Sequence, residues 1–496
     1  MDKTREIYNL FSDGGKYYFL SRPRRFGKSL LVSTLNEIFS GNRELFKDLW
    51  IYDKIKWEKY PVIHIDFSEL NYETPQRLEE TLGRLMEDIA GTYDISLDPQ
   101  RYYNEKFAQL IKKLSVKGKV VVLIDEYDKP IIDKIDEYEI AKDNRDILKA
   151  FFTILKSTGK YIKFAFITGV SKFSRVSVFS GLNNLRDITI SDKFSTLLGY
   201  TEEELRHYFE DRMVPGNYNL EKEQLQDAIR EWYNGYSWDG SNFVYNPHSI
   251  LTFFQEGRFD NYWFTSGTPS FLVKLLKEKQ KDIGEYEGKV VGNYVFESYD
   301  IDNLETTSLM FQTGYLTIKQ RRIVQETEME YTLSYPNKEV RESFIRHLFR
   351  SYTGREFDEG ARIIRDLTDA LLTGKHDLFF EILKSLFASI SYNIFIEDKE
   401  AYYHSIIYMI VKLMGVDIQT EVQTNKGRID AVIETGDTIY LMEFKIGSET
   451  DALEQIKRMG YAEKYVPRGK KVMLVGVGFD MEERNIGNYI LEPVNA

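Results

Sequence analysis

A Gly-Lys-Ser turn near the start of the chain has the residue types of a phosphate-binding loop. The apolar run 17–20 predicts a strand that leads into the turn, and residues 28–39 have the apolar spacing of a helix. In such a loop the backbone N–H groups surround the β-phosphate of a nucleoside triphosphate, the lysine reaches the β- and γ-phosphate oxygens, and the serine hydroxyl ligates Mg²⁺. The residues expected to bind the nucleotide here are Arg25, Phe26, Gly27, Lys28 and Ser29.

A pair of carboxylates about a hundred residues after this turn supports the same chemistry. The full loop pattern begins with a glycine, and Arg22 stands in its place, so the loop alone is also compatible with an ordinary strand-to-helix turn. The continuous apolar run 120–124, however, predicts a buried parallel strand that ends at Asp125 and Glu126. We expect Asp125 to hold the Mg²⁺ shell and Glu126 to orient the attacking water. The alternative is two solvated acids at the end of a strand.

Acidic and basic residues near the C-terminus predict another site. Residues 428–433 and 439–445 have the pattern of two strands joined by a two-residue turn at 436–437. Pairing about this turn sets Asp430 opposite Glu443, and the period of two places Lys445 on the same face as Glu443.

Facing carboxylates repel each other unless a cation lies between them, and their oxygens suit Mg²⁺ or Mn²⁺. Metal-assisted phosphodiester hydrolysis is the chemistry this predicts, and a cross-strand ion-pair ladder without catalytic function is the alternative. Glu400, on a helix expected over 399–413, and Gln455 and Tyr461, on a later helix, could complete the site.

Strands and helices alternate from residue 17 to residue 168, which predicts an α/β fold with a doubly wound parallel sheet. At the end of its last strand, Thr168 or Ser171 could sense the γ-phosphate or cap a helix. We expect four domains: 1–200 with the phosphate loop, 201–268 as a helical or winged-helix-like lid, 269–385 as a mostly helical connector with a hairpin around 315–335, and 386–496 with the second site.

Composition limits the class of protein. The 496 residues include no cysteine, which excludes disulfides and thiolate metal sites and fits a reducing compartment, the cytoplasm. No segment has the roughly twenty apolar residues of a membrane span. The net charge is −12, and residues 391–496 contain 12 Lys and Arg against 17 Asp and Glu. A nucleic-acid partner is therefore expected from the site chemistry and not from charge.

The chain resembles prokaryotic AAA-ATPase-like proteins with a C-terminal PD-(D/E)XK nuclease-superfamily domain. The resemblance spans nearly the whole chain. It lies in Phe19–Leu30 with the Ser-Arg-Pro-Arg-Arg-Phe-Gly-Lys-Ser form, in Leu123–Asp128, in Trp232–Tyr236, and in Gly427–Asp430 with Glu443–Lys445.

The resemblance makes Arg22 a family variant of the phosphate loop. It implies that Lys28, Ser29, Asp125 and Glu126 serve ATP and Mg²⁺. It also implies a restriction-endonuclease-like domain in which Asp430, Glu443 and Lys445 are the catalytic signature and Glu400 is the helix carboxylate that joins the metal site. Relatives usually carry a short segment before the Asp-Lys-Thr that follows Met1 here, so a shortened N-terminal edge of the ATPase domain is a further expectation.

Two functions follow as hypotheses. The first is an ATP-regulated, Mg²⁺-dependent nuclease acting on DNA, in which the nucleotide state of the first domain gates the second site. The other is a nucleotide-switched signalling or scaffold ATPase, which could form a homo-oligomer and whose nuclease-like domain binds a partner without cutting. The presence of all the defining side chains argues against two vestigial sites.

Overall fold

The computed structural model describes residues 1–172, 178–179, 181–214, 218, 220–264, 270–279, 282–297, 304–324, 328–355, 357–390, 400–424 and 427–494. They form two compact units, Met1–Ser266 with Val290–Lys338 and Gly267–Lys289 with Glu339–Ala496. The chain therefore passes between the units three times. Among the helices of the described ranges, none has the length and apolar character needed to cross a membrane.

A parallel five-stranded sheet forms the core of the first unit, as the alternating pattern predicts. The strand order is β2-β3-β4-β1-β5. β1, β3 and most of β4 are buried, which explains why their sequences are continuous apolar runs. The strands are β1 (Tyr17–Ser21), β2 (Val62–Asp66), β3 (Val120–Asp125), β4 (Ile162–Gly169) and β5 (Leu185–Asp187).

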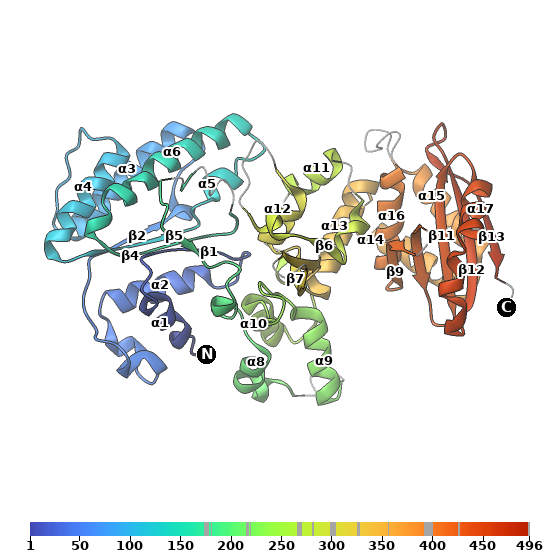
Figure 1. The fold of residues 1–496 in the computed structure, drawn as a ribbon, viewed down its shortest axis with the longest axis horizontal. Helices are drawn as coiled ribbons and strands as arrows, with labels where there is room; N and C mark the ends of the chain where they lie inside the picture. The colour runs from blue at the N-terminus through green and yellow to red at the C-terminus, as the bar shows by residue number, and fades with distance from the viewer. Residues whose placement is uncertain are drawn as a thin grey trace. The chain divides into compact units, whose positions relative to one another are not determined.

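Helices cover both faces of this sheet. α1 and α2 lie on one face, and α3, α4 and α6 lie on the other (Figure 1). The carboxyl ends of parallel strands meet at one edge of a sheet, so the loop after β1 lies near the end of β3. The helices are α1 (Thr4–Ser12), α2 (Lys28–Phe39), α3 (Pro75–Thr92), α4 (Tyr103–Leu114), α5 (Lys129–Ile132) and α6 (Tyr138–Ser157).

The rest of the first unit is largely helical, with a small sheet. Two β-bridges, Tyr200 to Tyr245 and Tyr236 to Val244, hold the helical segment together. The hairpin predicted around 315–335 is present and forms a three-stranded sheet of order β6-β8-β7. The elements are α8 (Glu202–Phe209), α9 (Lys222–Tyr233), α10 (Pro247–Glu256), β6 (Lys289–Val291), α12 (Thr306–Thr313), β7 (Thr317–Val324) and β8 (Glu328–Ser334).

The second unit combines a helical part with a mixed sheet of order β13-β12-β11-β10-β9. β11 and β12 run parallel, and α17 connects them, while the other neighbours are antiparallel. α17 packs on β11 and β12, and α16 packs on β9 and β11.

The helical elements of this unit are α11 (Ser270–Glu278), the 3-10 turn η10 (Ile283–Tyr286), α13 (Lys338–Thr353), α14 (Phe357–Leu372), α15 (His376–Ala388), α16 (Glu400–Leu413) and α17 (Glu449–Met459). The strands are β9 (Asp417–Gln423), β10 (Arg428–Glu434), β11 (Thr438–Ile446), β12 (Lys471–Asp480) and β13 (Asn485–Pro493). The four predicted domains were based on composition and periodicity, and their boundaries remain predictions.

Candidate functional site

The loop between β1 and α2 has the backbone of an anion-binding turn. Arg25 and Gly27 have positive φ angles of 63° and 87°, and α2 begins at Lys28 directly after Gly27. Residues in the left-handed region let a loop direct successive backbone N–H groups toward one point. The first turn of the following helix adds N–H groups that have no partner within the helix. Lys28 is buried, and its Nζ donates to the carbonyl oxygens of Arg22 and Pro23, both at 3.1 Å.

Carboxylates from the end of β3 lie beside this lysine. Burial raises the pKa of Asp125, and a hydrogen bond from Ser29 and the charge of Lys28 oppose the rise. Glu126 has a φ of 50°, which is uncommon for a residue with a side chain. Burial raises its pKa as well, against the charges of Lys28 and Lys129. The structure thus brings together Lys28, Ser29, Asp125 and Glu126.

Arg22, at the usual position of the loop's first glycine, is a buried anchor. Its guanidinium donates to the carbonyl oxygens of Thr189 and Phe194 at 2.8 and 3.3 Å and lies 3.8 Å from the centre of the Trp238 ring. Burial lowers the pKa of Arg22 to about 9, although Asp187 and Asp239 favour the charged form. Its side chain therefore ties the loop to distant segments, a function that the sequence pattern could not predict.

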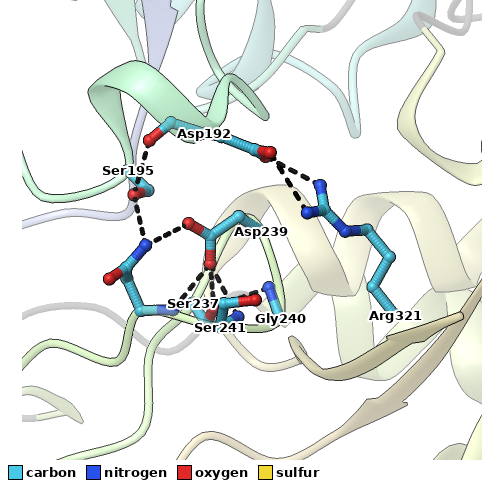
Figure 2. Close-up of polar contacts among 8 residues, drawn as sticks. Asp192, Ser195, Ser237, Asp239, Gly240, Ser241 and Arg321 are labelled. Carbon is cyan, nitrogen blue, oxygen red and sulfur yellow. Dashed lines mark hydrogen bonds and ion pairs between the residues drawn. The ribbon is translucent and has the colours of Figure 1, made fainter.

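A polar network supports the loop that carries Trp238. Figure 2 shows Asp239 accepting hydrogen bonds from the Ser237 hydroxyl and the Ser241 backbone, at 3.2 and 2.8 Å, while the adjacent Asn242 donates to it through Nδ2 at 2.6 Å. Burial acts to raise the pKa of Asp239, but these hydrogen bonds keep it below its ordinary value. Asp239 thus stays ionised and stabilises the buried charge of Arg22.

Arg25 and Phe26 contact the helical segment that follows the sheet. Arg25 Nη1 donates to the Tyr262 carbonyl oxygen at 2.8 Å and also contacts His248 Nε2. Burial and the Arg25 charge lower the pKa of His248, which favours the neutral ring. The Phe26 ring is fully buried and packs edge-on against Trp238. These two residues fix the loop's conformation, and a contact of their side chains with nucleotide stays a prediction.

A cavity of about 470 Å³ lies beside the loop; we call it the loop cavity. Its lining is mostly apolar and includes Ile7, Phe26, Leu30, Leu198 and Pro247. Leu30 projects from the first turn of α2 and is 72% exposed. An apolar recess next to an anion-binding turn suits a ligand with a planar base and a phosphate chain.

Thr168 and Ser171, the two candidates at the end of β4, differ in their hydrogen bonding. Ser171 donates to the buried carboxylate of Asp128 through both its backbone N–H and its hydroxyl, at 2.7 and 2.8 Å. Thr168 Oγ1, in contrast, is buried and has no hydrogen-bond partner within the described part of the chain. Thr168 is therefore the stronger candidate for a group that meets a ligand.

The C-terminal hairpin has the predicted register. β10 and β11 pair Ala431 with Met442 and Glu434 with Ile439, and the turn between them is two residues long. Extending this pairing by one residue places Asp430 opposite Glu443. Asp430 Oδ2 accepts a hydrogen bond from the Phe444 backbone N–H at 2.8 Å.

Glu443 is the most buried carboxylate of this second site. It has no exposed surface, and one of its oxygens accepts from Gln455 Nε2 and lies 3.7 Å from Lys445 Nζ. Its other oxygen, Oε2, is buried and has no hydrogen-bond partner in the described ranges. Burial and the charge of Asp430 raise the pKa of Glu443 to about 8. An orphan carboxylate oxygen beside a second acid fits a hard divalent cation such as Mg²⁺.

These side chains line a cavity of about 590 Å³, which we call the carboxylate cavity. Gln455 and Tyr461 line it, as the sequence indicated. Asp282 and Glu285, from the distant η10 region, and His404, from α16, also line it and were missed. His404 lies one helical turn after Glu400, a spacing that could have drawn attention to it, whereas no sequence signal linked residues 282–285 to the site.

The metal-ligand set is only partly visible. Glu400 begins α16, as predicted, but its side chain lies outside the described part. Among the described side chains, no group of three or more His, Asp or Glu lies within range of a common metal ion. Asp430 and Glu443 therefore supply two candidate ligands, and Glu400 stays the predicted third.

Comparison with known proteins agrees with the two sites. Residues 1–179 match the family model described as "Predicted AAA-ATPase", and residues 398–489 match the one described as "PD-(D/E)XK nuclease superfamily". The chain is also 38% identical over 505 residues to a protein of Azotobacter chroococcum mcd 1 named "Uncharacterized protein in vnfD 5'region". That similarity covers 99% of this chain and 95% of the relative.

Proposed function

The chain belongs to the AAA-ATPase-like proteins that carry a C-terminal domain of the PD-(D/E)XK nuclease superfamily, and on this basis we propose that it is an ATP-regulated, divalent-metal-dependent nuclease acting on DNA. One observation carries the proposal. Asp430, Glu443 and Lys445 share a cavity in a chain whose first unit also gathers Lys28, Ser29, Asp125 and Glu126 at a phosphate loop.

In the first unit, the loop and its neighbours bind and orient ATP. The α2 N-terminus faces the phosphates, and the loop cavity takes the base. Lys28 would exchange its hydrogen bonds to loop carbonyls for phosphate oxygens, and Ser29 and Asp125 would hold Mg²⁺. Glu126 would orient the attacking water.

In the second unit, Asp430 and Glu443 hold Mg²⁺ or Mn²⁺, with Glu400 as the predicted further ligand. A cation held by these residues would supply Lewis-acid polarisation of the scissile phosphate and charge stabilisation. Lys445 lies close enough to Glu443 to orient the attacking water, and Gln455 fixes the glutamate. Glu443 must be ionised to bind the cation, which links cleavage to pH.

Cleavage of single- and double-stranded DNA with Mg²⁺ or Mn²⁺, with and without ATP, tests the proposal. We expect Asp430→Ala to lower cleavage at least about 100-fold while ATP turnover is retained, because it removes a metal ligand. Lys28→Ala should abolish ATP turnover and alter the cleavage rate. Glu454→Ala, at an exposed position of α17, is the matched control and should leave both activities unchanged.

The signalling or scaffold function is the alternative, favoured by the acidic balance of the second unit's sequence. ATP turnover without any cleavage under these conditions would support it. Size-exclusion chromatography with and without ATP tests the homo-oligomer that this alternative includes.

A further inference from the structure

Four arginines surround a cavity of about 250 Å³ in the helical part of the second unit. Arg346 and Arg350 lie one turn apart on α13, Arg355 follows that helix, and Arg365 lies on α14. No acidic side chain is among the described residues that line this cavity. We call it the arginine pocket.

The remaining lining of the arginine pocket is apolar. Phe349 and Ile364 are buried there, and Leu413 from the end of α16 completes it. Gly360 lets α14 approach α13, because a Cβ at this position would lie 3.2 Å from the Phe349 ring. Cations around an apolar floor form a site for a ligand that is anionic at one end and apolar or planar at the other.

Two of the four arginines form ion pairs with acids on the same stretch of chain. Glu342 pairs with Arg346 at 3.3 Å, and Glu359 pairs with Arg355, each four residues away along the chain. Arg355 Nε is nevertheless buried with no hydrogen-bond partner in the described ranges. Arg365 forms no ion pair with any described residue. The buried, unsatisfied Nε of Arg355 and the Arg365 guanidinium could both donate to a bound anion, which would also reduce the repulsion between neighbouring guanidinium groups.

The arginine pocket is separate from the carboxylate cavity. Leu413 lies nine residues after His404 on α16, which is about 14 Å along the helix and on its opposite face. A ligand in the arginine pocket is therefore not the scissile group at Asp430 and Glu443.

We propose that the arginine pocket binds a nucleotide unit, with its phosphate on the guanidinium groups and its base on the apolar floor. Guanidinium groups bind phosphate oxygens through two parallel hydrogen bonds, and both guanidinium and aromatic surfaces accept a stacked base. The volume of about 250 Å³ lies just below the range of about 300–1,000 Å³ typical of small-molecule sites, which limits the ligand to no more than one nucleotide unit. The same chemistry occurs in a free nucleotide and in a nucleic-acid strand. The inference goes beyond the proposed function, because it requires neither ATP turnover nor cleavage.

The test uses the full chain carrying Lys28→Ala and Asp430→Ala, which removes binding at the phosphate loop and cleavage. AMP, inorganic phosphate and a short oligothymidylate are titrated separately by calorimetry. We expect the further double change Arg355→Gln and Arg365→Gln to weaken AMP or oligothymidylate binding at least tenfold. Arg362→Gln, which removes an exposed arginine of α14 outside the pocket, should have no effect.

Each outcome has a defined meaning. Saturable binding of AMP assigns the pocket to a free nucleotide, and binding of oligothymidylate alone assigns it to a strand. Binding of inorganic phosphate alone would overturn the proposal, because it would mean that the apolar surface holds no base. The proposal would be overturned if no probe binds, or if the double variant binds AMP and oligothymidylate as tightly as its parent does. It would also be overturned if Arg362→Gln weakens binding as much as the double change does. An unchanged urea-unfolding transition in the variant with the two arginine changes shows that its second unit is still folded.

Discussion

Glu443 is a buried carboxylate whose ionisation we expect to depend on a bound cation. Burial and the charge of Asp430 raise its pKa in the folded chain to about 8, well above the ordinary value of a glutamate, so the folded state binds the proton more tightly than the unfolded state does. Without a cation, folding stability should therefore fall as the pH rises from about 5 to 8. Glu443→Gln keeps the acceptor for Gln455 and cannot ionise, so it should be more stable than wild type at pH 8 by about 1 kcal/mol or more.

Urea unfolding in EDTA at pH 6 and pH 8 measures this difference. Added Mg²⁺ should stabilise wild type at pH 8 and not the variant. Glu454→Gln, at an exposed site on α17, is the control and should follow wild type. The same pH dependence in wild type and Glu443→Gln would contradict the assigned burial of this charge.

The η10 turn shows how a distant element completes the carboxylate cavity. Ile283 N donates to Ser405 Oγ at 3.1 Å, and Glu287, just after the turn, pairs with Lys412 at 2.7 Å, so the turn is fixed to α16. Gly284 packs so closely on β9 that a Cβ would lie 2.3 Å from Thr420 Oγ1.

Gly284→Ala should consequently displace η10 and with it Asp282 and Glu285. Because a shift of about 1 Å can cost about 100-fold in rate, we expect a 10- to 100-fold loss of cleavage with ATP turnover unchanged. Thr420→Ala removes the two closest atoms, and in combination with Gly284→Ala it should restore cleavage. Failure of this second change to rescue activity would exclude displacement of the turn as the cause.

Short-range patterns predicted much of the fold. The parallel sheet followed from apolar runs alternating with helical spacing, and the register at Asp430 and Glu443 followed from a two-residue turn and a period of two. Long-range packing was not predictable in this way. Three groups that hold the Arg22 guanidinium, on Thr189, Phe194 and Trp238, lie more than 160 residues away along the chain. The cavity position of Asp282 likewise depends on a turn that precedes α16 by over a hundred residues.

The same limit applies to the arginine pocket. Its four arginines belong to a stretch that also contains acids, so the composition of the stretch does not indicate a basic site. The arginines come together at one cavity only through the packing of α13, α14 and α16.

At the scale of the whole molecule, connectivity offers a route between the two sites. Residues 267–289 belong to the second unit, but both ends of this segment continue into the first unit. The segment carries Asp282 and Glu285 into the carboxylate cavity. A change in the first unit that pulls on either end could therefore alter the cavity.

Hydrogen exchange measured with and without ATP tests this coupling. We expect ATP to slow exchange of the phosphate loop and, at least about threefold, of residues 282–287, because binding that orders the first unit also restrains the ends of the segment. Lys28→Ala should abolish both effects. Residues 471–493, which span β12 and β13, belong to the second unit and are far along the chain from the segments that continue into the first unit, so they provide the internal control. Protection confined to the first unit would mean that ATP regulates cleavage, if at all, by a route other than this segment.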